Sequence, residues 1–94
     1  MSIRRVVLDV DKSLNRPTLV DLVESIERVP GVEAVNVSVT EMDMETMGTN
    51  ITVEGVGIDY GKLINTIEDS GAVIHSVDEI VAGKRIIESI RRDY

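Results

Sequence analysis

Residues 34–40 alternate strictly between valine and small or polar side chains, and no other stretch constrains the fold as strongly. One set is Val35, Val37 and Val39, and the other is Ala34, Asn36, Ser38 and Thr40. Successive side chains of a strand point to opposite faces, so this pattern predicts a strand with one buried face, as in antiparallel sheets. Residues 50–55 alternate again around Ile51 and Val53. The polar residues 41–48 between them are predicted to join the two strands as a hairpin.

Two other segments place apolar residues at helical spacing. Their stripes are Leu19, Leu22, Val23 and Ile26 in the first, and Tyr60, Leu63, Ile64 and Ile67 in the second. Thr18, after Pro17, and Asp59 stand where helix caps are expected, and Asp21 is in a capping-box relation to Thr18. Gly31 and Gly71 follow the predicted ends.

Residues 3–10 and 73–80 are rich in β-branched side chains and are predicted to be the first and last strands along the chain. After Gly83, helical spacing of Ile86, Ile87 and Ile90 predicts a short C-terminal helix. The order β-α-β-β-α-β is that of the ferredoxin-like split βαβ arrangement. We therefore expect one α+β domain over residues 1–94, with an antiparallel sheet in the order 4-1-3-2 and both helices on one face.

The composition excludes several classes of function. With 17 acidic and 10 basic residues the formal charge is −7, which argues against binding of nucleic acid and favours cations or basic partners. The absence of cysteine excludes disulfides, zinc thiolate sites and thiol catalysis. No apolar run approaches the roughly 20 residues of a membrane span. The first residues resemble a strand more than a signal peptide, so we expect a cytoplasmic protein without a membrane partner.

The segment LDVDKSLNRPTLVD, residues 8–21, raises the question of a calcium loop. Its oxygen-bearing side chains are Asp9, Asp11, Ser13 and Asn15, which fill positions 1, 3, 5 and 7 of an EF-hand. Leu14 stands where that loop needs glycine, and Val20 where it needs a bidentate glutamate, so the segment is not an EF-hand. A looser oxygen site using Asp9 and Asp11 is one alternative, and ordinary loop and cap residues are the other.

One face of the predicted sheet carries no helix, and three carboxylates are expected on it. If Asp9, Glu54 and Asp78 lie on neighbouring strands of this open face, they converge near Arg5. Arg5 alone could neutralise them as a structural ion-pair cluster, or a divalent cation could do so. For the last strand we favour Ile74, Ser76 and Asp78 on the open face, with Val73, His75 and Val77 inward.

The predicted hairpin mixes acids with methionines. The acids are Glu41, Asp43 and Glu45, and the methionines are Met42, Met44 and Met47. Contiguous exposed apolar groups tend to mark contacts, which favours a subunit interface here, with metal binding as the alternative. His75 is the single histidine, and its neighbour Ser76 would point to the opposite face of a strand, so no catalytic residues are predicted.

Several motifs together resemble the archaeal family known as domain of unknown function 211. The motifs are Leu8-Asp9-Val10, Gly31-Val32 with the valine alternation, residues 41–46, Val53-Glu54-Gly55 and, most specifically, residues 74–83. The resemblance covers essentially the whole chain. It implies a ferredoxin-like fold, closed oligomers and no assigned activity, and it implies that acidic positions such as Asp9, Asp43, Glu45, Glu54 and Asp78 are places to look for a divalent ion.

Two hypotheses about function follow. The first is a non-enzymatic, ring-forming homo-oligomer that binds a divalent cation, calcium or magnesium, through clustered carboxylates. Its candidate ligands are Asp9, Asp11, Asp43, Glu45, Glu54 and Asp78. The second is a regulatory module that binds a small metabolite such as an amino acid at a subunit interface, with Asp9 and Asp11 on its ammonium group and helix-start amides on its carboxylate.

Overall fold

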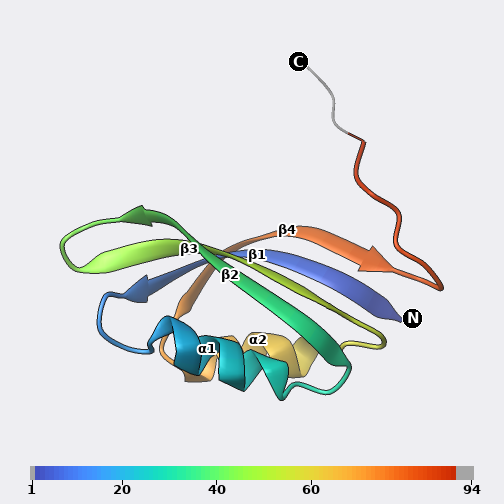
Figure 1. Cartoon of the computed structure of the whole chain (residues 1–94), viewed down its shortest axis with the longest axis horizontal. Coiled ribbons are helices and arrows are strands. Elements are labelled where there is room, and N and C mark those ends of the chain that lie inside the picture. Colours follow the sequence, from blue (N-terminus) through green and yellow to red (C-terminus); the bar gives the residue numbers. More distant parts are fainter. Residues whose placement is uncertain (1, 91–94) are drawn as a thin grey trace.

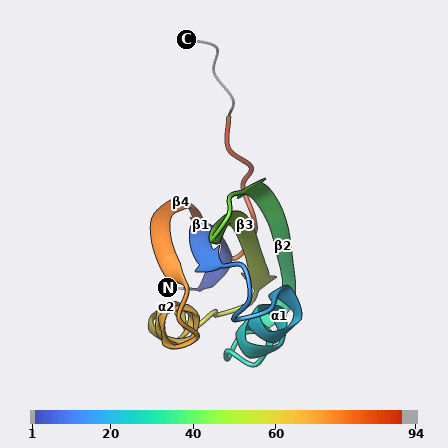
Figure 2. The same ribbon diagram turned by 90° about the vertical axis from the view of Figure 1, so that its left-hand side faces the viewer.

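The alternating segment forms an edge strand of a four-stranded antiparallel sheet in the computed structural model of the chain, which describes residues 2–90. The elements are β1 (Ile3–Ser13), α1 (Leu19–Glu27), β2 (Val32–Met42), β3 (Thr46–Gly55), α2 (Tyr60–Asp69) and β4 (Val73–Ala82). The strand order β2-β3-β1-β4 is the predicted order read from the other edge. Both helices lie on one face of the sheet and leave the other face open (Figures 1 and 2). The predicted ferredoxin-like fold is confirmed.

The core lies between the helices and the inward faces of the strands. Its fully buried apolar residues are Val6, Leu8, Val10, Ile51 and Val53 from the sheet, and Leu22, Ile26, Leu63 and Ile67 from the helices. Val35 pairs with Val53 and Val37 with Ile51, so these two valines of β2 pack against the core as predicted, whereas Val39 is exposed. The alternate residues therefore line the open face.

Side-chain caps begin both helices as the sequence indicates. Thr18 Oγ1 accepts a hydrogen bond from the Asp21 N–H at 3.0 Å, and Asp59 Oδ1 accepts one from the Lys62 N–H at 3.1 Å. Where β3 ends, Gly55 packs against the loop after α1, and a Cβ at Gly55 would overlap the carbonyl oxygen of Gly31. Gly31 itself has φ +88°, a backbone conformation that favours glycine.

The strands around the hairpin are longer than predicted. β1 continues to Ser13, and β2 and β3 leave only residues 43–45 as their connection. Met47 therefore lies within β3 and is 7% exposed, which corrects the expectation that it belongs to the surface tip. The sequence did not predict the extension of β1, because an Asp-x-Asp-x-Ser run is typical of loops. The same run also fits a strand that has one solvent-exposed face.

Two of the three irregularities in the pairing of β1 with β4 interrupt the predicted phase of the last strand, which holds for Ser76 and Val77 but not for the residues before them. Val10 pairs with Ile74, which packs on the core, and Asp11 pairs with Val73, which is exposed. The register skips His75, which is exposed and does not face inward. A β-bulge shifts side chains from one face to the other, so a constant period of two could not predict the whole strand.

The predicted C-terminal helix is wrong for the residues that the structure describes. Residues 83–90 form no helix, and the predicted remainder lies outside the described residues. The segment rises from the end of β4 on the side of the sheet opposite the helices (Figures 1 and 2). Ile87 and Ile90 are 70% and 78% exposed. A helix this short is marginal in water unless its apolar face is buried, and this segment buries no such face in a single chain.

Candidate functional site

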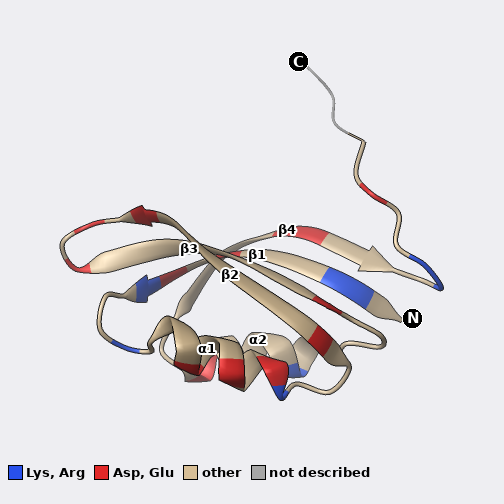
Figure 3. Ribbon diagram, viewed as in Figure 1, with Lys and Arg blue, Asp and Glu red and all other residues tan. Residues whose placement is uncertain are grey.

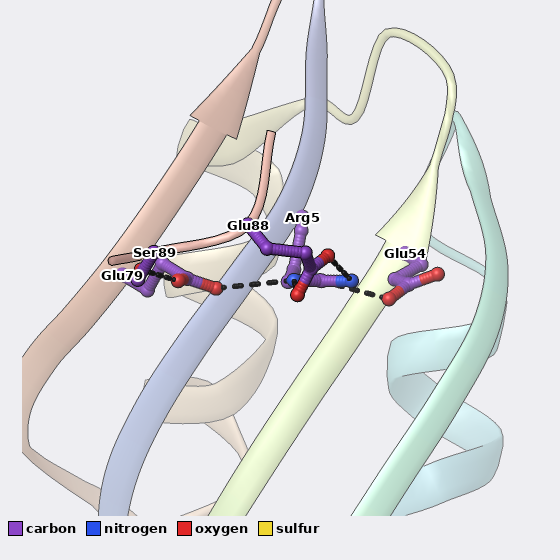
Figure 4. Close-up of polar contacts among 5 residues, drawn as sticks. All are labelled: Arg5, Glu54, Glu79, Glu88 and Ser89. Carbon is purple, nitrogen blue, oxygen red and sulfur yellow. Dashed lines mark hydrogen bonds and ion pairs between the residues drawn. The ribbon is translucent and has the colours of Figure 1, made fainter. Parts of the chain in front are cut away.

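Arg5 is the centre of an ion-pair cluster on the open face. Its Nε donates to Glu54 Oε2 at 2.8 Å across the β1–β3 pair, and its Nη1 donates to Glu79 Oε1 at 3.4 Å across the β1–β4 pair. Nη1 and Nη2 also contact the two oxygens of Glu88 at 3.1 and 2.9 Å. Ser89 donates its hydroxyl to the other oxygen of Glu79. Figure 4 shows this cluster joining β3, β1, β4 and the segment after β4.

The electrostatics of this cluster match its geometry. The hydrogen bond from Arg5 holds the pKa of the Glu88 carboxyl below its ordinary value, because the guanidinium stabilises the carboxylate. In turn, hydrogen bonds to Glu88 and then Glu54 raise the pKa of Arg5 above its ordinary value. The Arg5 side chain is only 16% exposed, so neighbouring residues restrict the orientation of its guanidinium N–H donors. This arrangement corresponds to the first of the two predicted alternatives, a structural ion-pair cluster in which Arg5 neutralises the carboxylates.

The structure brings only part of the predicted carboxylate set to Arg5. Glu54 is there as expected, but Glu79 takes the place predicted for Asp78. Asp78 accepts instead from the Ser76 hydroxyl at 2.7 Å, and Asp9 lies further along β1, between Asn50 and Ser76. The register of β1 with β4 skips Asp78, which explains why its neighbour Glu79 reaches Arg5.

A second acidic group surrounds a hollow at the hairpin end of the sheet. The hollow has a volume of about 280 Å³ and is lined by Asp11, Glu41, Met42, Asp43, Thr46 and Gly48. Asp11 and Asp43 belong to the predicted metal set. The strand extension to Ser13 puts Asp9 and Asp11 on the same face of β1, but only Asp11 lines the hollow.

The register explains why carboxylates meet at this hollow. Asp11 pairs with Gly48 on one side, and Gly48 pairs with Glu41 on the other, so the two acids flank a residue without a side chain. A Cβ at Gly48 would lie 3.1 Å from Glu41 Cγ and 3.5 Å from Asp11 Oδ1. Asp43 is fixed at the turn, where its N–H bonds to the Thr46 carbonyl at 2.8 Å. Gly48 thus forms the floor of the hollow, and its lack of a side chain leaves space between Asp11 and Glu41.

The donor atoms at the hollow suit hard cations, which prefer carboxylate and carbonyl oxygens. Among residues 2–90, however, no three Asp, Glu or His side chains are gathered closely enough to hold a metal ion by themselves. Glu45, another predicted ligand, is exposed, and its carbonyl accepts from the Leu14 N–H at 3.1 Å. An ion at the hollow would therefore need further oxygen ligands from water or from a second molecule.

Sequence reasoning missed Glu79 and Glu88 as partners of Arg5. Glu79 follows the predicted Asp78 directly. The sequence therefore showed two adjacent acids near the end of the strand but not which of them contacts Arg5. Glu88 lies in a segment predicted to be a helix, and nothing in its spacing indicated a contact with β1. His75 is exposed beside Ser76, whose hydroxyl is bonded to Asp78.

The part of the chain from residue 2 to 90 contains no helix with the length and apolar character of a membrane span. The fold and its two acidic groups define the class of protein: a small ferredoxin-like α+β domain with two groups of carboxylates on the open face of its sheet. Comparison with known sequences then gives the family. The model of the family DUF211, described as "Uncharacterized ArCR", matches residues 4–94, and the chain belongs to this family.

A relative in Methanocaldococcus jannaschii supports the same assignment. This relative is named "Uncharacterized protein MJ0319" and is 40% identical over 89 residues, which cover 95% of this chain and 91% of the relative. The resemblance inferred from the sequence motifs is confirmed. Neither the family description nor the name of this relative states an activity.

Proposed function

We propose that this protein is a non-enzymatic homo-oligomer whose acidic hollow binds a divalent cation, with calcium preferred over magnesium. The observation that carries the proposal is the hairpin end of the sheet, where three carboxylates and the exposed Met42 line one hollow and Met44 is exposed in the same hairpin. The methionines favour a contact between copies, and the carboxylates favour a cation.

Self-association is supported by what a single copy leaves uncovered. Met42 and Met44 are 64% and 89% exposed at the hairpin. The sheet also ends in two long edge strands, β2 with 11 residues and β4 with 10, and each presents unpaired backbone groups on its outer side. Exposed edges of this length favour pairing with another chain, and a closed assembly covers them.

Cation binding is supported by charge and by the floor of the hollow. Asp11, Glu41 and Asp43 line one hollow on a chain of formal charge −7, and like charges on one face favour a bound cation. Calcium accepts six to eight oxygen ligands in flexible geometry, whereas magnesium demands a strict octahedron. A wide, open arrangement completed by water or by a second copy suits calcium better.

A small metabolite with an ammonium group is the second candidate, because about 280 Å³ is close to the roughly 300 Å³ at which small-molecule pockets begin. The expected binding mode needs revision, however. Asp11 lies on the open face, whereas both helices lie on the other side of the sheet (Figure 1). Helix-start amides therefore do not face the same ligand as Asp11.

Calorimetric titration of the chelator-treated full chain with calcium, and separately with magnesium, tests the cation proposal. We expect saturable binding of calcium in the micromolar range and weaker binding of magnesium. No heat with calcium at two temperatures would contradict the proposal. A thermal-shift screen with amino acids tests the second candidate, and stabilisation by one of them, with no calcium heat, would favour it.

A further inference from the structure

Residues 84–90, which follow β4, form an apolar and basic arm whose isoleucines have no apolar surface to pack on in a single copy. Ile86, Ile87 and Ile90 are exposed, while Glu88 and Ser89 contact Arg5 and Glu79 on the open face, the side on which the segment leaves β4 (Figures 1 and 2). The last eleven residues contain four bases and two acids, whereas the preceding 83 residues contain six bases and fifteen acids. The arm therefore differs in charge from the body of the protein.

The end of the sheet that carries the hollow is acidic and apolar, and so complements the basic and apolar arm. Asp11, Glu41 and Asp43 supply negative charge there, and Met42 supplies apolar surface. Val73, which is exposed, pairs with Asp11 and extends the apolar surface on the other side of it. In Figure 3 the acidic hairpin and the basic segment after β4 lie at opposite ends of the sheet.

The arm cannot reach the hollow of its own copy while its observed contacts hold. Gly83 is fixed to the start of β1, where its N–H donates to the Ser2 carbonyl at 2.7 Å and its carbonyl accepts from Arg4 Nε at 2.8 Å. Glu88 is fixed to Arg5, so residues 84–87 are tethered at both ends. Six residues of strand separate Arg5 from Asp11, a distance of about 20 Å at roughly 3.3 Å per residue.

We propose that the arm docks on a second copy, with Lys84 and Arg85 against the carboxylates of the hollow and the isoleucines against Met42 and Val73. This inference rests on the self-association proposed above, and it specifies the surfaces through which two copies make contact. Each copy presents one arm and one hollow, so a closed assembly built on this contact uses every arm and every hollow. Complementary charge then selects which surfaces meet.

Charge reversal in the full chain tests this pairing. The arm variant is Lys84→Glu with Arg85→Glu, and the matched control is Arg28→Glu with Lys62→Glu, which makes the same change of charge at exposed positions on the helix side. The rescue variant adds Asp11→Lys and Asp43→Lys to the arm variant. A fourth variant, Ile87→Ser with Ile90→Ser, removes apolar surface without changing charge.

The self-association constant is measured by sedimentation at micromolar concentration in chelator, so that no divalent cation competes with the arm. Thermal melting first confirms that each variant is folded. We expect at least tenfold weaker association for the arm and isoleucine variants, unchanged association for the control, and recovery in the rescue variant.

The outcomes separate this inference from the function on which it rests. A parent chain that stays monomeric in chelator overturns the arm, and one that stays monomeric with calcium as well also contradicts the proposed oligomer. An assembled parent whose arm and isoleucine variants associate equally well overturns the arm alone. Weakening without recovery in the rescue variant overturns the hollow as the docking surface.

Discussion

Two nitrogens of Arg5 hold the two carboxylate oxygens of Glu88, at 3.1 and 2.9 Å, and so tie the segment after β4 to the first strand. Glu54 and Glu79 contact the same guanidinium from the strands on either side. One arginine thus organises this end of the open face and sets the point from which the arm projects.

Glu88→Gln should loosen the arm, because a neutral amide loses the ion pair with Arg5. The expected result is roughly twofold to fivefold faster limited trypsin cleavage after Lys84 and Arg85, in line with the small contribution of exposed ion pairs. Glu68→Gln, on the exposed side of α2, is the control. Equal cleavage rates for the parent and Glu88→Gln would show that this contact does not hold the arm.

The contact should also depend on pH in a defined direction. Arg5 lowers the pKa of Glu88 in the docked segment relative to the free segment, so docking is fully present above the free value and is lost as pH falls through the lowered one. A carbon NMR titration of the Glu88 carboxyl follows this. Arg5→Met should raise the Glu88 midpoint, whereas Arg28→Met, at an exposed position on the helix side, should leave it in place. An unchanged midpoint in Arg5→Met would contradict the assignment.

Gly55→Ala should destabilise the fold by about 2–3 kcal/mol, because the new Cβ would overlap the Gly31 carbonyl and the backbone must move. Gly61→Ala is the matched change, in an open position near the start of α2, and should stabilise by about 0.5–1 kcal/mol through helix propensity. Chemical denaturation measures both. Equal stabilities for the two variants would contradict the close approach at Gly55.

The hollow predicts which acids matter for calcium. Asp11→Asn and Asp43→Asn should each weaken binding by about tenfold or more, since carboxylate count tunes affinity. Asp9→Asn and Asp78→Asn make the same change outside the hollow and should have little effect. Gly48→Ala, which keeps the charge and fills the floor, should also weaken binding. Calorimetry gives each affinity, and a larger loss in Asp9→Asn than in Asp11→Asn would place the ion elsewhere.

Local patterns were sufficient to predict the fold. Thr18 and Asp59 cap the helices, and Val35 and Val37 pack against the core, because capping and alternation each depend on a few neighbouring residues. Together they determine the order of elements, and that order allows few topologies. The strand order in the sheet followed from this alone.

The sites were less predictable because they depend on register. Glu79 reaches Arg5 where Asp78 was expected, since an irregularity in the β1–β4 pairing is not visible in a period of two. Glu41 and Asp11 meet only because Gly48 pairs with both. The contact between Arg5 and Glu88 spans nearly the whole chain, and no local pattern indicates it.

The mass of the native full chain in solution tests the central claim, self-association, most directly. Sedimentation equilibrium at about 10 µM, in chelator and again with calcium, should give a multiple of the 10.3 kDa chain mass in at least one condition. A single species of 10.3 kDa in both conditions would contradict the proposed oligomer, and with it the role of the hairpin end as a contact between copies.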